Sequence, residues 1–246
     1  MNFKPFVRHS ACLALVLAMV PPAQATWTIV AVDADTNEVG SAGASCTPFV
    51  AGVARLIPGH GAVVAQARSN MAAKDMASEM IALDQPTGAI LAAITDRDFD
   101  STAPQQQYGL AVLRDGGKLA GAAAFTGSET HGSRGQIVGE TFAVQGNILA
   151  NDSVLQASYD AYAKAEEKDL PLAERLLRAL EAGAEAGGDR RCGPTKTAQS
   201  AYLGVAIPSD TSRDLSLKII VSTDRDSDEN PIVEVRRRYD RALDKR

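Results

Sequence analysis

The order of strand and helix patterns along the chain limits its fold more than any other feature of the sequence. Groups of β-branched and small residues alternate with pairs of amphipathic stretches, and turn-forming residues separate them. Strands in hairpins, kept apart from paired helices, are typical of a layered α+β domain and not of a parallel doubly wound sheet. The expected elements are strands at 26–32, 39–45 and 61–67, helices at 70–83 and 88–95, strands at 108–113, 118–125 and 142–146, helices at 152–167 and 171–187, and strands at 201–207 and 215–222.

Three of the predicted helices begin with residues that favour a helix N-terminus. Thr87 and Asp152 are expected N-caps, because a hydroxyl or carboxylate there accepts a hydrogen bond from the first turn. Pro171 suits the first turn of the last predicted helix. Asn151 begins a glycosylation sequon, which we interpret more simply as part of the helix start at Asp152.

The first 25 residues have the three parts of a secretory signal peptide in the right order. Lys4 and Arg8 supply the positive region, residues 11–20 are continuously apolar, and residues 23–25 (AQA) fit the small-x-small cleavage rule. We therefore expect cleavage after Ala25 and a periplasmic or secreted protein. An uncleaved amphipathic start is the alternative interpretation.

Composition excludes two classes of protein. The 25 Lys and Arg residues against 30 Asp and Glu residues give a net charge of −5, which argues against nucleic acid as a partner. No apolar run reaches the roughly 18–20 residues that span a bilayer. We expect one domain at residues 26–223, followed by a solvated, charged C-terminal tail at residues 224–246.

Two cysteines remain once the signal peptide is removed, Cys46 and Cys192. In an oxidising compartment they are candidates for a disulfide, which would contribute about 4–5 kcal/mol by closing a long loop. Two buried free thiols are the alternative, because the sequence does not show whether the cysteines come within bonding distance.

Most of the common catalytic motifs are absent from the sequence. It contains no nucleophile elbow, HExxH motif, phosphate-binding loop, dinucleotide fingerprint or paired CxxC motif. After processing, His60 and His131 are the remaining histidines, and the glycines beside each favour exposed loops. We therefore expect no metal site and no cofactor.

An N-terminal threonine offers chemistry that needs no histidine. Cleavage after Ala25 would give Thr26 a free α-amine, whose reference pKa of about 7.7–8.0 leaves a useful neutral fraction at pH 7. That amine would take the proton from the Thr26 hydroxyl and make it a nucleophile. The alternative is that Thr26 is an ordinary first residue of a strand.

Five stretches of the chain form a recognisable set, namely TWTIVAVDADTNEVGSAGAS (26–45), AFTG (124–127), FAVQGNIL (142–149), PLAERLLRALEAGAEAGGDRR (171–191) and QSAYLGV (199–205). Together they resemble one known family, the domain of unknown function 1028 family (DUF1028). The resemblance covers roughly residues 26–207 and implies a four-layer αββα sandwich with an N-terminal-nucleophile (Ntn) hydrolase-like fold, with hydrolysis of an amide as the activity. It implies no particular substrate.

The motifs that carry this resemblance suggest polar neighbours for Thr26. Four amides would donate to an oxyanion or hold substrate, and an arginine oriented by an aspartate would bind a substrate carboxylate. Capped turns or a salt bridge between helix and sheet are the structural alternatives. The candidates are Gln66, Asn70, Gln145, Asn147, Asp189 and Arg190.

The chain departs from the family pattern in three places. Residues 46–49 (CTPF) replace a larger basic or aromatic residue, and the loop between AFTG and VQGN is compact and lacks a tryptophan. Residues 192–198 are inserted. The first and third departures each introduce a cysteine, which is consistent with one added disulfide.

Three functions are consistent with these observations. The first is a secreted amidohydrolase that acts on a small-molecule or peptide amide with Thr26 as its nucleophile. The second is a catalytically silent binding module for an envelope or cell-wall-derived ligand, because a fold does not establish an activity. The third is a structural envelope protein that assembles through its charged tail, so self-association as a homo-oligomer stays open.

Overall fold

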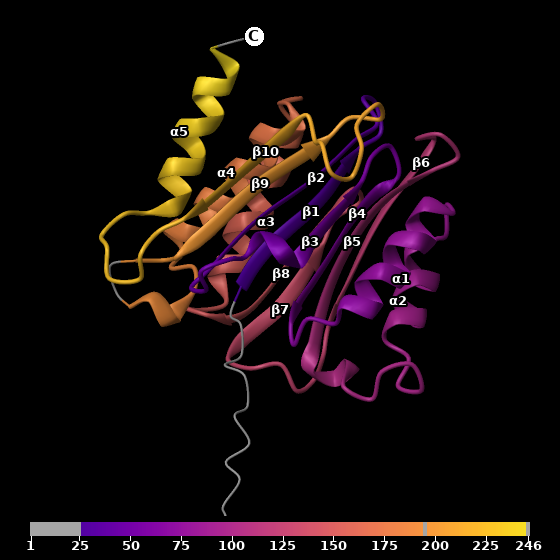
Figure 1. Cartoon of the computed structure of the whole chain (residues 1–246), viewed down its shortest axis with the longest axis horizontal. Helices are drawn as coiled ribbons and strands as arrows, with labels where there is room; N and C mark the ends of the chain where they lie inside the picture. Colours follow the sequence, from indigo (N-terminus) through magenta and orange to yellow (C-terminus); the bar gives the residue numbers. More distant parts are fainter. Residues whose placement is uncertain (1–25, 194–195, 245–246) are drawn as a thin grey trace, which may run out of the picture.

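The computed structural model describes residues 26–193 and 196–244 (Figure 1). Within these residues the chain forms two antiparallel β-sheets and five α-helices, which confirms the expected α+β class. The predicted signal peptide at residues 1–25 lies outside the described residues. No helix in the described part of the chain is long and apolar enough to cross a lipid bilayer.

The larger sheet, as far as the structure describes the chain, has six strands in the order β10-β9-β2-β1-β8-β7. The predicted hairpin lies at its centre and pairs Trp27 with Ala44 and Val32 with Val39. Both faces of β1 are buried, so this strand contains apolar residues on both sides. The strands are β1 (Thr26–Asp33), β2 (Glu38–Ser45), β7 (Ser133–Val138), β8 (Phe142–Leu149), β9 (Ser200–Ala206) and β10 (Leu217–Ser222).

The smaller sheet has the strand order β3-β4-β5-β6. Its predicted hairpin is joined by Asp115, Gly116 and Gly117, which all have positive φ angles, of 51°, 63° and 92°. Glycine adopts this left-handed backbone at little cost, so the turn follows directly from the local sequence. The strands are β3 (Ala54–Ile57), β4 (Gly61–Ala67), β5 (Gln106–Arg114) and β6 (Leu119–Thr126).

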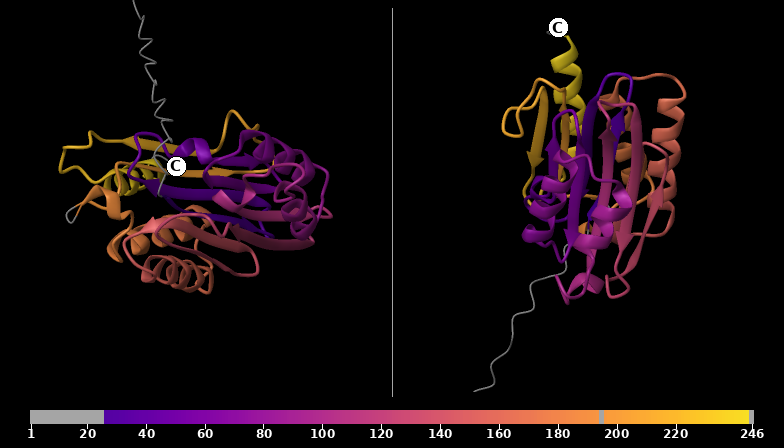
Figure 2. Two further views of the ribbon diagram at one scale, coloured as in Figure 1. Left: turned by 90° about the horizontal axis from the view of Figure 1, so that it is seen from below. Right: turned by 90° about the vertical axis from the view of Figure 1, so that its right-hand side faces the viewer.

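Two pairs of helices cover the outer faces of the paired sheets (Figures 1 and 2). α3 (Ser153–Glu166) and α4 (Leu172–Glu185) contact the larger sheet, and α1 (Met71–Ala82) and α2 (Thr87–Ile94) contact the smaller one. Three apolar clusters fill the spaces between these layers. The first cluster lies between the larger sheet and the helices α3 and α4, and includes Trp27, Ile29 and Leu176. The second lies between the two sheets and includes Val30, Val32 and Leu113. The third lies between the smaller sheet and the helices α1 and α2, and includes Ile81, Ile90 and Leu110.

The alternation of side chains along β1 determines which way its first residue points. Trp27 and Ile29 pack beneath the helices, whereas Val30 and Val32 pack between the two sheets. Since successive side chains of a strand point to opposite faces, the even-numbered Thr26 lies on the face directed at the smaller sheet. The first residue of β1 therefore points into the space between the sheets.

The charged C-terminal segment is not the solvated tail that the sequence suggests. Residues Pro231–Leu243 form α5, which packs on β9 and β10 through the buried side chains of Ile232, Val235 and Tyr239. These three residues are spaced three and four apart and share one helix face. The charged residues between them cover the other face, where Arg236 pairs with Glu174 and Glu181 of α4.

Two helix starts also differ from the sequence prediction. Pro86, not Thr87, is the N-cap of α2, and no side chain caps this end. The Asp152 carboxylate does not cap α3, because it accepts a hydrogen bond from the Ser133 hydroxyl. The Asn151 carboxamide accepts from the Ser153 amide instead. β3 and β7, both short and at sheet edges, are absent from the predicted elements.

We expect Leu176→Ala to destabilise the fold strongly. Leu176 is fully buried between α4 and the larger sheet, and removing a buried leucine side chain costs about 2–5 kcal/mol. Leu119→Ala is the matched control, because Leu119 is 49% exposed and its loss should cost about 0.5 kcal/mol or less. Chemical denaturation of both variants measures the difference, and equal effects would contradict this packing.

Candidate functional site

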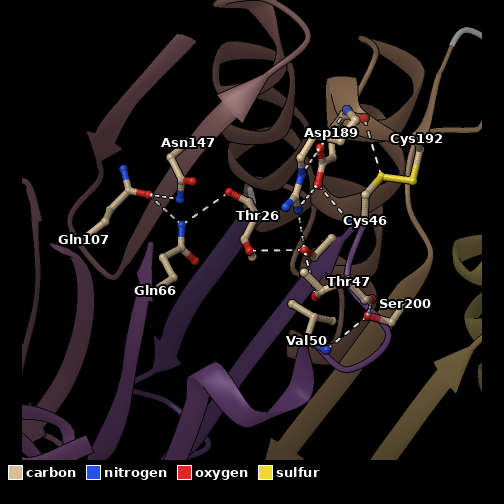
Figure 3. Close-up of polar contacts among 12 residues, drawn as sticks. Thr26, Cys46, Thr47, Val50, Gln66, Gln107, Asn147, Asp189, Cys192 and Ser200 are labelled. Carbon is tan, nitrogen blue, oxygen red and sulfur yellow. Dashed lines mark hydrogen bonds and ion pairs between the residues drawn. A yellow bond between two sulfur atoms is a disulfide. The ribbon is translucent and has the colours of Figure 1, made fainter. Parts of the chain in front are cut away.

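Thr26 belongs to a row of polar side chains at one end of the space between the sheets (Figure 3). Asn147 on β8 lies opposite Thr26, Ser45 ends the neighbouring β2, and Ser200 on β9 lies opposite Ser45. Residues opposite one another on paired strands share a face of the sheet, so all four point toward the smaller sheet. Each of them is buried, and Thr26 is 1% exposed.

The hydroxyl of Thr26 contacts a small polar cluster. Its Oγ1 donates to Ser45 Oγ at 3.3 Å, and Thr47 Oγ1 donates to the same oxygen at 3.1 Å. The guanidinium of Arg191 reaches Ser45 Oγ through Nη2 at 3.4 Å. Ser45 therefore connects the hydroxyl of Thr26 to a positive charge.

Arg191 is held in place by a fully buried carboxylate. Asp189 accepts hydrogen bonds from Nε of Arg191 at 3.1 Å and from its Nη2 at 2.7 Å, and its own exposure is 0%. The backbone amide of Cys46, which follows β2, also donates to Asp189 at 2.7 Å. A carboxylate without solvent requires such donors, so this contact fixes the chain after β2 relative to Arg191.

The predicted pairing of Asp189 with Arg190 is wrong, because Asp189 pairs with Arg191. Arg190 is exposed, whereas the Asp189 carboxylate forms its ion pair with the following residue, Arg191. The difference arises because Asp189 caps the short 3-10 helix η3 (Arg190–Cys192), accepting a hydrogen bond from the Arg191 amide. This turn directs the side chain of the second arginine back onto its own cap.

The disulfide that the sequence left open is present between Cys46 and Cys192, whose Cα atoms are 5.6 Å apart. Figure 3 shows this bond between Cys46 and Cys192 close to Asp189. In the sequence, Cys46 follows Ser45, and Cys192 follows Arg191. The bond therefore joins the end of β2 to η3 directly beside the Asp189–Arg191 ion pair.

A second polar row lies on the facing sheet. Gln66 on β4, Gln107 on β5 and Thr126 on β6 occupy paired positions. The amide nitrogen of Gln66 donates to Gln107 Oε1 at 2.7 Å, and Gln107 Nε2 donates to Thr126 Oγ1 at 2.8 Å. Gln107 Oε1 also accepts from Asn147 Nδ2 at 3.1 Å, which links this row to the larger sheet.

Gln66 and Gln145 form a second link between the sheets through Thr28. Gln145 Nε2 donates to the Thr28 hydroxyl at 2.6 Å, and that hydroxyl donates to Gln66 Oε1 at 2.8 Å. Gln66 Nε2 also lies 3.4 Å from the carbonyl oxygen of Thr26. Gly109 on β5 makes room for Gln145, since a Cβ there would lie 2.2 Å from Gln145 Oε1. These two glutamines hold the backbone around Thr26.

Asn70 is not part of this site, although the sequence placed it there together with Gln66. It is the N-cap of α1, accepting from the Ala73 amide and donating to the Asp100 carboxylate. Ala67 between them has a φ of 64°, so the chain turns away from β4 before Asn70. Burial alone would raise the pKa of Asp100, but hydrogen bonds from Thr102, Gln106 and Asn70 outweigh burial and lower that pKa to about 2.

Several residues of the site are missing from the sequence prediction, among them Ser45, Gln107 and Arg191. The sequence predicts Ser45 only as the last residue of a strand, at the end of the hairpin where the other strand begins. Gln107 lies in a run of three glutamines at 105–107, an unusual start for a buried strand. That run is a sign that polar side chains continue from Gln66 onto the neighbouring strand.

Neither histidine contributes to the site. The His60 ring contacts the Asp84 carboxylate at 3.2 Å, and His131 is exposed. Among the described residues, no histidine or carboxylate hydrogen-bonds to the Thr26 hydroxyl. No group of three or more His, Cys, Asp or Glu residues within residues 26–193 and 196–244 is arranged to hold a metal ion.

The model of a family described as "Family of unknown function (DUF1028)" matches residues 26–235, from the first residue of β1 into α5. The chain belongs to the DUF1028 family. No curated protein matches the sequence.

The fold of this DUF1028 chain resembles a solved structure of the same family. The crystal structure of protein SPO2555 from Silicibacter pomeroyi, described as a DUF1028 protein, matches it with a TM-score of 0.71. The sequences are 24% identical, and the match covers 89% of this chain and 86% of the other. This likeness shows a common fold.

Replacing Arg191 should destabilise the DUF1028 chain far more than replacing its neighbour Arg190. Arg191→Met leaves the Asp189 carboxylate buried without its counter-charge, which costs about 3–5 kcal/mol. Asp189→Asn should cost less, because the Arg191 side chain is 24% exposed and retains water as a partner. Arg190→Met is the control, with an expected change of about 0.5 kcal/mol or less. Equal free energies of unfolding for the two arginine variants would contradict the assigned pairing.

Proposed function

We propose that this DUF1028 protein is a secreted or periplasmic Ntn amidohydrolase whose nucleophile is Thr26. Removal of residues 1–25 by a signal peptidase creates the catalyst, since it leaves a hydroxyl and an α-amine on one residue. The observation that carries the proposal is the place of Thr26. It opens a central strand and directs its hydroxyl into a polar cluster between two sheets.

The arrangement of the layers supports this proposal. One pair of helices covers the larger sheet, the other pair covers the smaller sheet, and the sheets face each other. We interpret this as the four-layer αββα sandwich of Ntn-type enzymes. The family match also begins at Thr26, the residue that cleavage after Ala25 would expose.

The proposed reaction has two steps and consumes one water. The Thr26 hydroxyl attacks the carbonyl carbon of the amide while its proton passes to the α-amine of Thr26. The C–N bond breaks, the leaving amine takes that proton, and the acyl group stays on Thr26 as an ester. Water then hydrolyses the ester, releasing a carboxylic acid and restoring the hydroxyl.

Arg191 supports the base in this proposal. Its guanidinium lies one hydroxyl, that of Ser45, away from the hydroxyl of Thr26. A positive charge near an amine lowers the pKa of that amine, because it disfavours the protonated form. The Asp189–Arg191 pair would therefore help to keep the α-amine of Thr26 neutral and able to accept a proton.

Asn147 is the proposed oxyanion donor. It lies opposite Thr26 in the sheet, and its Nδ2 has one hydrogen-bond acceptor among the described residues, Gln107 Oε1. A primary amide has two N–H groups, so one is available to a developing oxyanion. Preorganised donors of this kind stabilise the tetrahedral intermediate of acyl transfer.

The first test of this function is the identity and position of the first residue. In protein that begins at residue 26, Thr26→Ala should lower amide hydrolysis by several orders of magnitude, and Thr26→Ser should retain part of it. One glycine added before Thr26 should be as harmful as the alanine, because it removes the α-amine from its place beside the hydroxyl.

Thr36→Ala controls for general effects on the same hairpin, because Thr36 is exposed at its turn. Activity is measured on a panel of acyl amides and short peptides, with intact mass confirming each N-terminus. Normal turnover by the glycine-extended protein would refute the mechanism. The binding module would be favoured instead if none of the proteins turned over a substrate and a ligand stabilised the wild type and the Thr26→Ala variant equally.

Replacing Asn147 should reduce the rate more than the binding of substrate. If it donates to the oxyanion, Asn147→Ala should lower kcat by about 100-fold to 1,000-fold with little change in KM. The surface variant Asn151→Ala is the control, since Asn151 lies outside the site and is exposed. Steady-state kinetics and thermal unfolding of both variants separate a catalytic loss from a loss of fold. An unchanged kcat would exclude this role.

A further inference from the structure

A pocket of about 390 Å³ opens beside the polar cluster of Thr26. Its lining combines the Cys46 end of the disulfide, Pro48 and four polar side chains. Those four are Thr47, Arg191, Gln199 and Arg225.

The residues that line this pocket include hydrogen-bond donors suited to an anion. Two arginines, one glutamine and one threonine are among its lining residues, and each of these side chains can donate hydrogen bonds. No carboxylate is among the lining residues, and Asp224 and Asp226, which flank Arg225 in the sequence, do not line it. Guanidinium groups bind carboxylates particularly well, because their paired N–H donors match the two oxygens.

Arg225 distinguishes this pocket from an ordinary ion-pair network. Its side chain is exposed, and neither a hydrogen bond nor an ion pair joins it to any other residue that the structure describes. Arg191 on the other side is held by the buried Asp189 carboxylate, which sets the direction of its guanidinium. One arginine is thus fixed in orientation, and the other carries an unbalanced charge.

Two residues connect the pocket to Thr26. Arg191 and Thr47 line the pocket and both donate to Ser45 Oγ, at 3.4 and 3.1 Å, and Ser45 accepts from the Thr26 hydroxyl at 3.3 Å. A group bound between the arginines therefore lies only one side chain away from the proposed nucleophile. A substrate that fills the pocket and reaches Thr26 needs only a few bonds between its charge and its amide.

We propose that this pocket binds a carboxylate of the substrate, and that the enzyme hydrolyses amides bearing a carboxylate a few bonds from the scissile C–N bond. This inference rests on the proposed function. Two substrate classes share the required chemistry, N-acyl amino acids with the carboxylate on the amine side and monoamides of dicarboxylic acids with it on the acyl side. In either case water adds across the C–N bond, and the carboxylate itself does not react.

The test compares charged and neutral substrates in the protein that begins at residue 26. N-benzoylglycine is paired with N-benzoylethylamine, and succinic monoanilide with butyric anilide, so that each pair differs in its carboxylate. We expect the wild type to prefer the acid of at least one pair, which also identifies the side of the amide that carries the charge. Arg225→Gln should lower that preference, measured as a ratio of kcat/KM values, by about tenfold, because one charge-assisted contact is lost.

Arg213→Gln is the matched control, because it removes the same charge from an exposed site in the loop at the opposite end of β9. Its preference should equal that of the wild type. Equal rates on acids and neutral amides, or equal effects of the two arginine variants, would overturn the carboxylate pocket while leaving the amidohydrolase intact.

A binding experiment decides the inference separately from activity. Calorimetry with the Thr26→Ala protein measures the affinity for acetylglycine, succinate and inorganic phosphate. Binding of either carboxylate that Arg225→Gln weakens about tenfold and Arg213→Gln leaves unchanged supports the pocket even if no amide is hydrolysed. Absence of carboxylate binding, or phosphate binding of equal strength, would overturn the assignment.

Discussion

The buried carboxylate of Asp189 is the interaction on which the site depends. It receives the Cys46 amide that follows β2 and the guanidinium of Arg191, and its backbone bridges to Leu149 at the end of β8. Ser45 and Asn147, which flank Thr26, lie on these same two strands. Because a solvent-free carboxylate is costly unless its donors are in place, Asp189 forces these strand ends and η3 into one arrangement.

The space between the sheets is divided into an apolar and a polar part, and this division locates the site. Valines 30 and 32 fill it toward the centre of β1, whereas amides and hydroxyls fill it around Thr26. Buried amides are tolerated when they bind one another, as Gln66 and Gln107 do here. Such a layer holds fixed dipoles at the place where the proposed reaction would develop charge.

Local patterns in the sequence located most of the elements but not the contacts between them. Apolar periodicity and turn residues located the central hairpin and α4, whereas the charges of α5 masked its apolar stripe. The motif containing Gln66 and Asn70 looked like one functional unit, yet the left-handed backbone at Ala67 separates them. Whether Asp189 binds Arg190 or Arg191 depends on the turn that Asp189 itself caps, and no periodicity reports that geometry.

The burial of Thr26 also constrains when the proposed catalyst can form. β1 is paired along both edges, with β2 and with β8, and Thr26 is 1% exposed in the uncut chain. A peptidase binds its substrate in an extended, accessible form. In the proposed processing, the bond between Ala25 and Thr26 must therefore be cut before β1 pairs with its neighbouring strands. Under the proposed function, cleavage during export would meet this requirement, because it would remove the leader before the two sheets close. Under the proposed function, secretion therefore prepares the catalyst as well as determining where the protein is found.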